Sequence, residues 1–309
     1  MRILAILLGF FATAGYASIS AEEGSDHSRI IDKVHLVGSD PEEFFERVRL
    51  AVNFSSLVFA GQRAQPGQFP MQAFLSYASR KGGFYICGAS LLSTTHAVTA
   101  GHCTVDMTKP AEIMVGGTNM RQRGGNAQWR RINKITTFPE YNKHDPRIRK
   151  DIGIVEFSPP VQLNHYVQTT KIVSDDSQLL RSKKAVISGF GTHKYAFLVP
   201  QTSENLLFAE VNLYNFNYCR SRWFQMDPAQ TQICAGAKNH GTGQGDSGGP
   251  IQVRHNGKLY QVGLTSYGAA NPNDAQYNQD RFPSVFTRVS KYCNFISKTT
   301  NGKARCGQL

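Results

Sequence analysis

Short apolar runs separated by small polar turns make up most of the chain. Such runs recur from about Gly61 onward, at Phe84–Ile86, Ala97–Thr99, Ile152–Val155, Ala185–Ile187 and Val262–Leu264. Gly, Pro, Asn and Ser lie between them, and no long amphipathic helical window interrupts the series. Short strands at this spacing are typical of a β-sandwich or β-barrel. The sequence therefore predicts an all-β fold.

A helical pattern follows the last strand. Val289, Cys293 and Ile296 are spaced at helical intervals, and Ser290 has the side chain of an N-cap. We expect a C-terminal helix over residues 290–297. The polar stretch 159–182 is expected to link two halves of the fold.

The first twenty residues have the composition of a secretory signal peptide. Arg2 precedes ten mainly apolar residues, 3–12, and small residues follow up to Ser18. The alternative is a buried N-terminal helix or strand. The run is too short for a membrane span, which needs about 20 apolar residues, and no later segment supplies one. We expect a secreted, extracellular protein without a membrane span and with paired cysteines.

Composition excludes several protein classes. Of 309 residues, 40% are hydrophobic and 18% charged, which excludes wholesale disorder. Six cysteines are too few to form the whole scaffold of such a chain, but they can form a few disulfides.

Charge divides the chain into an acidic leader and a basic body. Residues 21–57 hold eight acidic and four basic residues, a net charge of −4, and residues 58–309 hold 29 basic and 14 acidic residues, a net charge of +15. The leader is interpreted as a pro-segment, with a mobile tail as the alternative. The basic body is expected to bind polyanions such as heparin in a salt-sensitive way. Nucleic-acid binding is not expected, because no recognition module is present.

Three segments carry residues suited to acyl transfer. Ser247 lies in the run Gly-Asp-Ser-Gly-Gly-Pro (245–250), where the amides of Gly245 and Ser247 can converge on an oxyanion. His102 precedes Cys103, whose pairing would fix the position of the imidazole. Asp151 opens an apolar strand, and beside an imidazole it would hold the tautomer. Taken singly, each has a structural reading: a turn, a structural histidine, and an edge carboxylate.

The order His102, Asp151, Ser247, with these local sequences, resembles the chymotrypsin/trypsin family of serine endopeptidases. The resemblance covers about residues 58–297 and extends to the runs 66–70, 189–191, 232–236 and 266–268. It implies two six-stranded antiparallel β-barrels, with the active site in the cleft between them and a C-terminal helix. The implied boundaries are about 71–160 for the first barrel, about 183–289 for the second, and 290–309 for the helix and tail, within a peptidase domain at 58–309.

The resemblance also assigns roles. Ser247 is the implied nucleophile, His102 the acid and base, and Asp151 its orienter, with the amides of Gly245 and Ser247 as the oxyanion hole. Ser266 and Gly268 would pair with the substrate backbone. The partners are protein or peptide substrates, no cofactor or metal is expected, and the protein is expected to be a monomer. A non-catalytic binding or regulatory module of the same fold is the alternative.

Six cysteines are predicted to form three disulfides. Cys87–Cys103 and Cys219–Cys234 match family pairs, and Cys293–Cys306 follows by elimination and from its short loop. A further family bridge, which braces the specificity pocket, has no cysteines here, because its first position is Gly243.

The implied specificity pocket has small residues and no carboxylate. Its floor is Gly241, where trypsins have aspartate, and its walls include Ser266, Gly268 and Ser284. An unpaired basic side chain there would be costly, so the sequence predicts a preference for aromatic or large apolar residues before the cut.

The mature start is predicted at Val58, whose freed amine would pair with Asp246. The preceding residue is Leu57 rather than the usual Arg or Lys, so the predicted activator prefers apolar residues and this protein itself could serve. The alternative is a latent chain in which Val58 is never freed. The one glycosylation sequon, at Asn53, lies in the leader.

Overall fold

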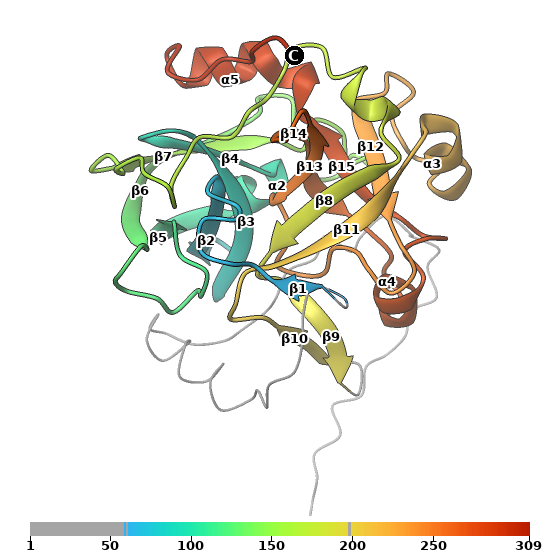
Figure 1. The fold of residues 1–309 in the computed structure, drawn as a ribbon, viewed down its shortest axis with the longest axis horizontal. Coiled ribbons are helices and arrows are strands. Elements are labelled where there is room, and N and C mark those ends of the chain that lie inside the picture. The colour runs from blue at the N-terminus through green and yellow to red at the C-terminus, as the bar shows by residue number, and fades with distance from the viewer. Residues whose placement is uncertain (1–58, 60, 197–198) are drawn as a thin grey trace, which may run out of the picture.

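Two closed barrels of antiparallel strands form the body of the molecule (Figure 1). The structure is a computed structural model that describes Phe59, residues 61–196 and residues 199–309. The predicted signal peptide, pro-segment, Asn53 sequon and mature start at Val58 lie outside the described residues.

The first barrel has the strand order β2-β3-β4-β7-β6-β5. Its strands are β2 (Gln72–Ser79), β3 (Phe84–Ser93), β4 (His96–Thr99), β5 (Met107–Val115), β6 (Gln128–Thr137) and β7 (Gly153–Ser158). The helix α2 (Gly101–Val105) follows β4. Strand β3 is buried along its whole length, and the amide of Gly88 in its middle donates to the carbonyl oxygen of Ser247 in the other half of the molecule (2.8 Å).

The second barrel closes through the order β11-β12-β15-β14-β13-β8, with β8 pairing back to β11. Its strands are β8 (Lys184–Gly189), β11 (Leu207–Tyr214), β12 (Gln232–Gly236), β13 (Pro250–His255), β14 (Lys258–Tyr267) and β15 (Ser284–Arg288). Strand β1 (Gln62–Arg63) adds to β11, and β9 (Thr192–Ala196) pairs with β10 (Val199–Thr202). Helices α3 (Phe216–Arg222) and α4 (Pro272–Tyr277) lie in connections between strands. The predicted all-β fold of two six-stranded barrels is confirmed.

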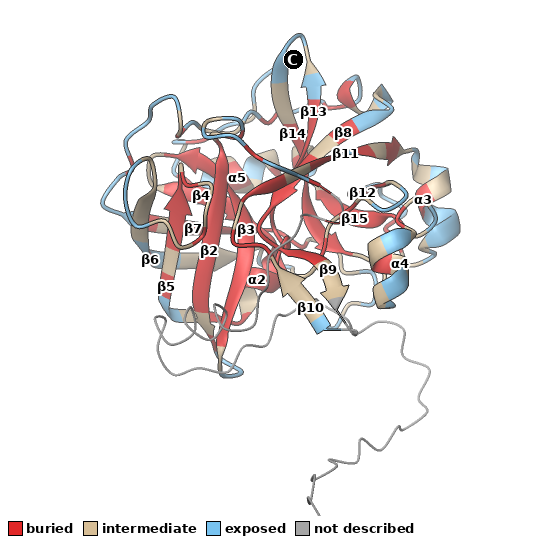
Figure 2. Ribbon diagram, turned by 60° about the horizontal axis from the view of Figure 1, so that its bottom comes forward, coloured by how far each residue is buried: buried red, intermediate tan, exposed pale blue. Residues whose placement is uncertain are grey.

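Each barrel encloses its own apolar core, as the buried strands in Figure 2 show. Strand β11 alternates buried and less buried positions along its length, which is the period of two expected of a strand with one face on the core. Leu75, Leu91 and Ile113 fill the first barrel, and Leu207 and Phe286 fill the second. Because both barrels close, few unpaired strand edges remain for aggregation.

The segment between the barrels has little regular structure. Residues 159–183 contain one 3-10 turn (Leu179–Arg181) and isolated bridges. Val161 and Val167 pack on the first core, whereas Val173 and Leu179 pack on the second. The segment is therefore fixed at both ends by its few apolar side chains.

The C-terminal helix begins later than the sequence predicts. A 3-10 turn (Val289–Tyr292) precedes α5 (Cys293–Thr299), and Tyr292 rather than Ser290 is the N-cap. The prediction that Ser290 caps the helix is wrong, because Ser290 already belongs to the 3-10 turn. Within the described residues, no helix is long and apolar enough to cross a membrane.

All three expected disulfides are present, at Cys87–Cys103, Cys219–Cys234 and Cys293–Cys306. The third joins the start of α5 to the C-terminal tail, where Gly307 bonds to the backbone of Ile172 and Ser174.

Candidate active site

Helix α2 fixes His102 beside the junction of the two barrels. The helix begins directly after β4, and the Cys87–Cys103 disulfide ties it to β3. A Cβ atom on Gly101 would lie 3.0 Å from the amide nitrogen of Ile152, so glycine allows α2 to approach the segment that holds Asp151.

Asp151 is fully buried and binds His102 twice. Its Oδ1 accepts from the backbone amide of His102 (2.7 Å), and its Oδ2 accepts from His102 Nδ1 (2.8 Å). Ser266 Oγ donates to the same Oδ2 (2.6 Å), and Thr287 Oγ1 donates to the Asp151 carbonyl oxygen (2.8 Å). Four hydrogen bonds thus hold Asp151 in place just before β7.

This arrangement fixes the tautomer of His102. Because a carboxylate only accepts, Nδ1 carries the proton and Nε2 is left as the basic nitrogen. Nε2 is buried and has no hydrogen-bond partner among the described residues. The imidazole is therefore held in the orientation that a general base requires.

A partly buried tyrosine, Tyr141, contacts the helix that carries His102. A Cβ atom built on Gly101 would lie 3.1 Å from Cγ of the Tyr141 ring, so the ring packs closely on this glycine. Burial, and then the negative charge of Asp151, raise the pKa of Tyr141. This phenol therefore stays neutral and adds no charge beside the carboxylate.

The loop 243–249 brings Ser247 against the first barrel. A Cβ atom on Gly248 would overlap Thr99 Oγ1, just before α2, and Gly248 has a positive φ of 75°. Cys103 Sγ lies 3.7 Å from the Ser247 carbonyl oxygen. Glycine at 248 is therefore required both by the backbone conformation and by the close approach. The backbone of Ser247 thus lies against Cys103, the residue that follows His102, although Ser247 and Cys103 belong to different barrels.

Two amides of this loop are available to a ligand. The amides of Asp246, Gly248 and Gly249 donate to backbone carbonyl oxygens. Across the described part of the chain, those of Gly245 and Ser247 donate to none. Two such amides in one tight loop are the usual donors to a developing oxyanion.

The Asp246 side chain packs against the start of this loop and against the residues at and after the end of β8. Its carboxylate accepts from the amides of Gly191 (2.8 Å) and Gly243 (2.9 Å) and is buried. Cβ atoms on Gly189 and Gly191 would overlap its carboxylate. Both glycines are thus needed for the aspartate to take this position. Val58, its predicted partner, lies outside the described residues.

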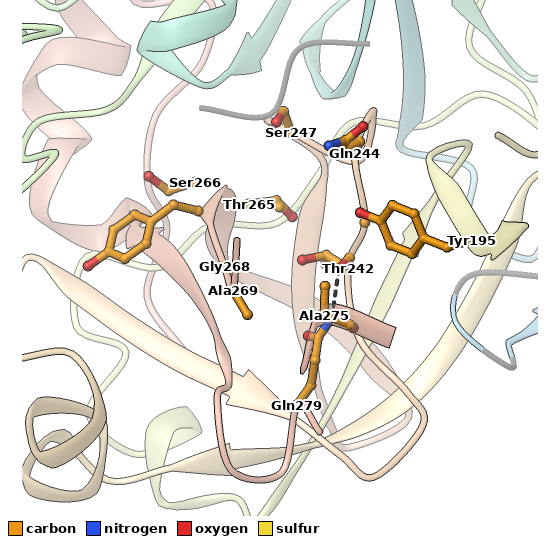
Figure 3. A pocket seen from close by; sticks show the side chains of 12 residues that line it. Tyr195, Thr242, Gln244, Ser247, Thr265, Ser266, Gly268, Ala269, Ala275 and Gln279 are labelled. Carbon is orange, nitrogen blue, oxygen red and sulfur yellow. Dashed lines mark hydrogen bonds between the residues drawn. The ribbon is translucent and has the colours of Figure 1, made fainter. Parts of the chain in front are cut away.

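A pocket extends from Ser247 toward α4 (Figure 3). In Figure 3, Ser247 lies near the top of the view, Ala275 lies below Thr242 near the middle, and Gln279 lies below both. Ser266 and Gly268 are among the residues that line it.

The predicted floor, Gly241, and one predicted wall residue, Ser284, are placed differently from the prediction. Gly241 and Ser284 are not among the residues that line the pocket. A Cβ atom on Gly241 would overlap Gln279 Oε1, and Ser284 Oγ donates to that oxygen and lies behind Gly268. The predicted preference for aromatic or large apolar residues assumes small residues at these positions, whereas the structure places the Gln279 side chain beside Gly241. Sequence reasoning missed Gln279, Thr242 and Tyr195 as lining residues. The one sequence signal was the absent pocket disulfide, because without it another group has to join Gly243 to the segment that follows Gly268.

One cluster of metal-ligating residue types occurs in the described part of the chain. Cys87, His102 and Cys103 have ligand atoms within 4.8 Å of one another. Both sulfurs are joined in a disulfide, so neither is a thiolate that could bind a metal ion.

Comparison with known proteins gives a consistent result. Residues 58–296 match the model of the Trypsin family. The chain is 32% identical over 244 residues to chymotrypsin-like elastase family member 1 of Macaca fascicularis, covering 78% of this chain and 89% of that protein. The human protein of that name is 30% identical over 242 residues (78% and 91%), and human family member 3B is 29% identical over 249 residues (79% and 89%). With its His102–Asp151 pair and its Ser247 loop, the chain belongs to the trypsin family and is a serine endopeptidase.

Proposed function

We propose that the protein is a secreted endopeptidase, made as a zymogen, that cleaves peptide bonds through an acyl-enzyme at Ser247. The observation that carries the proposal is the buried His102, held by Asp151 with Nε2 unpartnered, next to the Ser247 loop. The N-terminal signal-like segment supports secretion.

Each residue has a defined step. His102 Nε2 takes the proton of Ser247 Oγ as this oxygen attacks the scissile carbonyl carbon, and Asp151 stabilises the imidazolium. The amides of Gly245 and Ser247 donate to the oxyanion. The imidazolium then protonates the leaving amine, and water, deprotonated by His102, hydrolyses the acyl-enzyme. Ser266 and Gly268 pair with the substrate backbone.

The proposed residue before the cut is uncharged and apolar. No carboxylate is among the residues that line the pocket, so a lysine or arginine would leave its charge unpaired. Within the apolar class, the sequence predicts aromatic or large residues. The test is a peptide library with the side chain before the cut varied. Strict cleavage after arginine would refute the proposal.

Activation is proposed to occur after Leu57, by an enzyme that prefers apolar residues or by the protein itself. A new amine at Val58 would bind the buried Asp246, whereas an amine shifted by even one residue would lose this partner. N-terminal sequencing of the active secreted form tests the idea. A start at Val58 is expected, and full activity with the leader attached would refute it.

The competing function is a non-catalytic binding module. It is not favoured, because such a module has no need for a buried histidine and aspartate pair beside a loop in which the amides of Gly245 and Ser247 donate to no backbone carbonyl oxygen. The processed protein should react with a fluorophosphonate probe, and Ser247→Ala should not. A folded, processed protein that fails to react would support the module.

The basic body is proposed to bind polyanions, and the protein to be a monomer. Its +15 charge supports heparin binding through long-range attraction. On a heparin column the protein should elute later than a neutral protein, and added salt should make it elute earlier. Elution together with a neutral protein would refute heparin binding. Light scattering tests the monomer.

A further inference from the structure

Gln279 occupies the place of a missing side chain at the end of the pocket. Gly241 has no side chain, and a Cβ atom built on it would overlap Oε1 and Cδ of Gln279. The carboxamide, from a residue 38 positions later in the chain, thus fills the space that a side chain at 241 would take. Gln279 is only 2% exposed, yet it is among the residues that line the pocket.

A closed set of hydrogen bonds holds this carboxamide. Its Nε2 donates to the carbonyl oxygens of Thr242 (2.8 Å) and Ala275 (2.7 Å), and its Oε1 accepts from Ser284 Oγ (2.7 Å). Thr242 Oγ1 donates in turn to Ser284 Oγ (2.7 Å). Both amide hydrogens are used, so displacing the side chain would leave several buried polar groups unpaired.

The same contacts join the segments that lack a disulfide. Gly243 stands where the family resemblance leads one to expect a cysteine, and no cysteine follows in the segment 269–283. Gln279 connects Thr242, next to Gly243, with Ala275 of α4 and with Ser284 at the start of β15. The amide therefore provides a noncovalent brace at this end of the pocket.

We propose that Gln279 is a specificity-determining residue that forms a neutral floor and shortens the pocket. Side chains of the size of alanine or valine end before this floor. An aromatic ring would have to displace the carboxamide and break its hydrogen bonds, and a basic side chain would find no carboxylate. This inference rests on the proposed function at Ser247, and it narrows the apolar class to its smaller members rather than the aromatic residues that the sequence predicts.

The test compares peptide substrates that differ only in the residue before the cut: alanine, valine, leucine, phenylalanine. With concentrations set by active-site titration, the parent enzyme should have a kcat/KM for valine about tenfold above that for phenylalanine. Gln279→Ala opens the floor and should raise the phenylalanine-to-valine ratio about tenfold or more. Gln279→Met fills the space without the hydrogen bonds and should keep the parental ratio while lowering stability. Gln168→Ala, at an exposed position outside the pocket, is the matched control and should leave the ratio unchanged.

Two results would overturn the inference. One is a parent enzyme that prefers phenylalanine to valine, a measurement that needs no variant and so decides even if Gln279→Ala does not fold. The other is a Gln279→Ala enzyme that loses activity equally on all four substrates, because a brace alone would not change the ratio. Failure of the proposed function looks different: the processed parent would then neither react with a fluorophosphonate nor cleave any member of the series.

Discussion

The ring of Phe59 stacks on the ring of Tyr195, with centroids 5.9 Å apart and planes inclined by 20°. Phe59 is fully buried, and Tyr195 lines the pocket beside Ser247. The backbone amide of Tyr195 also donates to Gln276 Oε1 in α4 (2.8 Å). Phe59, which follows the predicted mature start, thus supports Tyr195 and, through Tyr195, contacts α4 on another side of the pocket.

Phe59→Ala should therefore destabilise the protein and impair the site together. Removing a buried phenylalanine ring costs about 3–5 kcal/mol, and the unsupported Tyr195 should lower the fraction of enzyme that an active-site titrant labels. Chemical denaturation and titration measure the two effects. Phe59→Leu, which keeps an apolar side chain, should lose less of both. A Phe59→Ala protein with parental stability and labelling would contradict this.

Ser247→Ala and His102→Ala should each remove most peptide-bond turnover. Loss of a member of such a triad lowers turnover by about 10⁴- to 10⁶-fold. The measurement is kcat on a peptide substrate, with circular dichroism to show that the variants are folded. A processed, folded Ser247→Ala protein as fast as its parent would show that the mechanism is wrong.

Ser266→Ala should slow the chemical step by acting through Asp151. The variant loses one of the hydrogen bonds to Asp151 Oδ2, and a hydrogen bond to a charged group is worth enough to lower kcat about tenfold. In an Asp151→Asn background the same change should have a smaller effect, because the coupled partner is altered. Equal effects in both backgrounds would show that Ser266 acts independently of Asp151.

His193 should make stability depend on pH below neutrality. Burial, and then the positive charge of Lys194, lower the pKa of His193 to about 4, against about 6.5 in the unfolded chain. Between these values the unfolded state binds the extra proton, so stability falls as the pH drops from 6.5 to 4.

Denaturation curves at several pH values should show this loss, and His193→Gln should reduce it. The exposed His144 is the matched control, and His144→Gln should leave the pH dependence as it is in the parent. An unchanged slope in His193→Gln would assign the effect to other groups.

Replacing Cys293 and Cys306 together by serine should lower stability without a large change in catalysis. The disulfide spans a sequence separation of 13 residues, for which the chain-entropy model gives about 3 kcal/mol. The bond ties the tail that pairs with Ile172 and Ser174, away from Ser247. A fall in kcat as large as the one expected for Ser266→Ala would show that this disulfide also supports the active site.

Much of the fold could be predicted from local patterns. Short apolar runs with turn residues indicate strands, and the three chemistry-bearing segments, in their order, indicate which family fold those strands build. Local signals were less reliable at the ends of elements. Ser290 has the side chain of a helix cap, but a 3-10 turn extends past it, so α5 starts at Cys293.

The sequence by itself marked His102, Asp151 and Ser247 as the candidate catalytic residues, because a local motif carries each of them, and it determined the absence of a carboxylate at 241. Only the tertiary structure decided what fills the space beside Gly241. A glycine leaves that space open to any neighbour, and the neighbour is a glutamine 38 residues away whose position depends on hydrogen bonds to Thr242, Ala275 and Ser284. Contacts between residues so far apart in the chain leave no periodic or local signal in the sequence, since they arise only when the barrel closes and brings the two loops together.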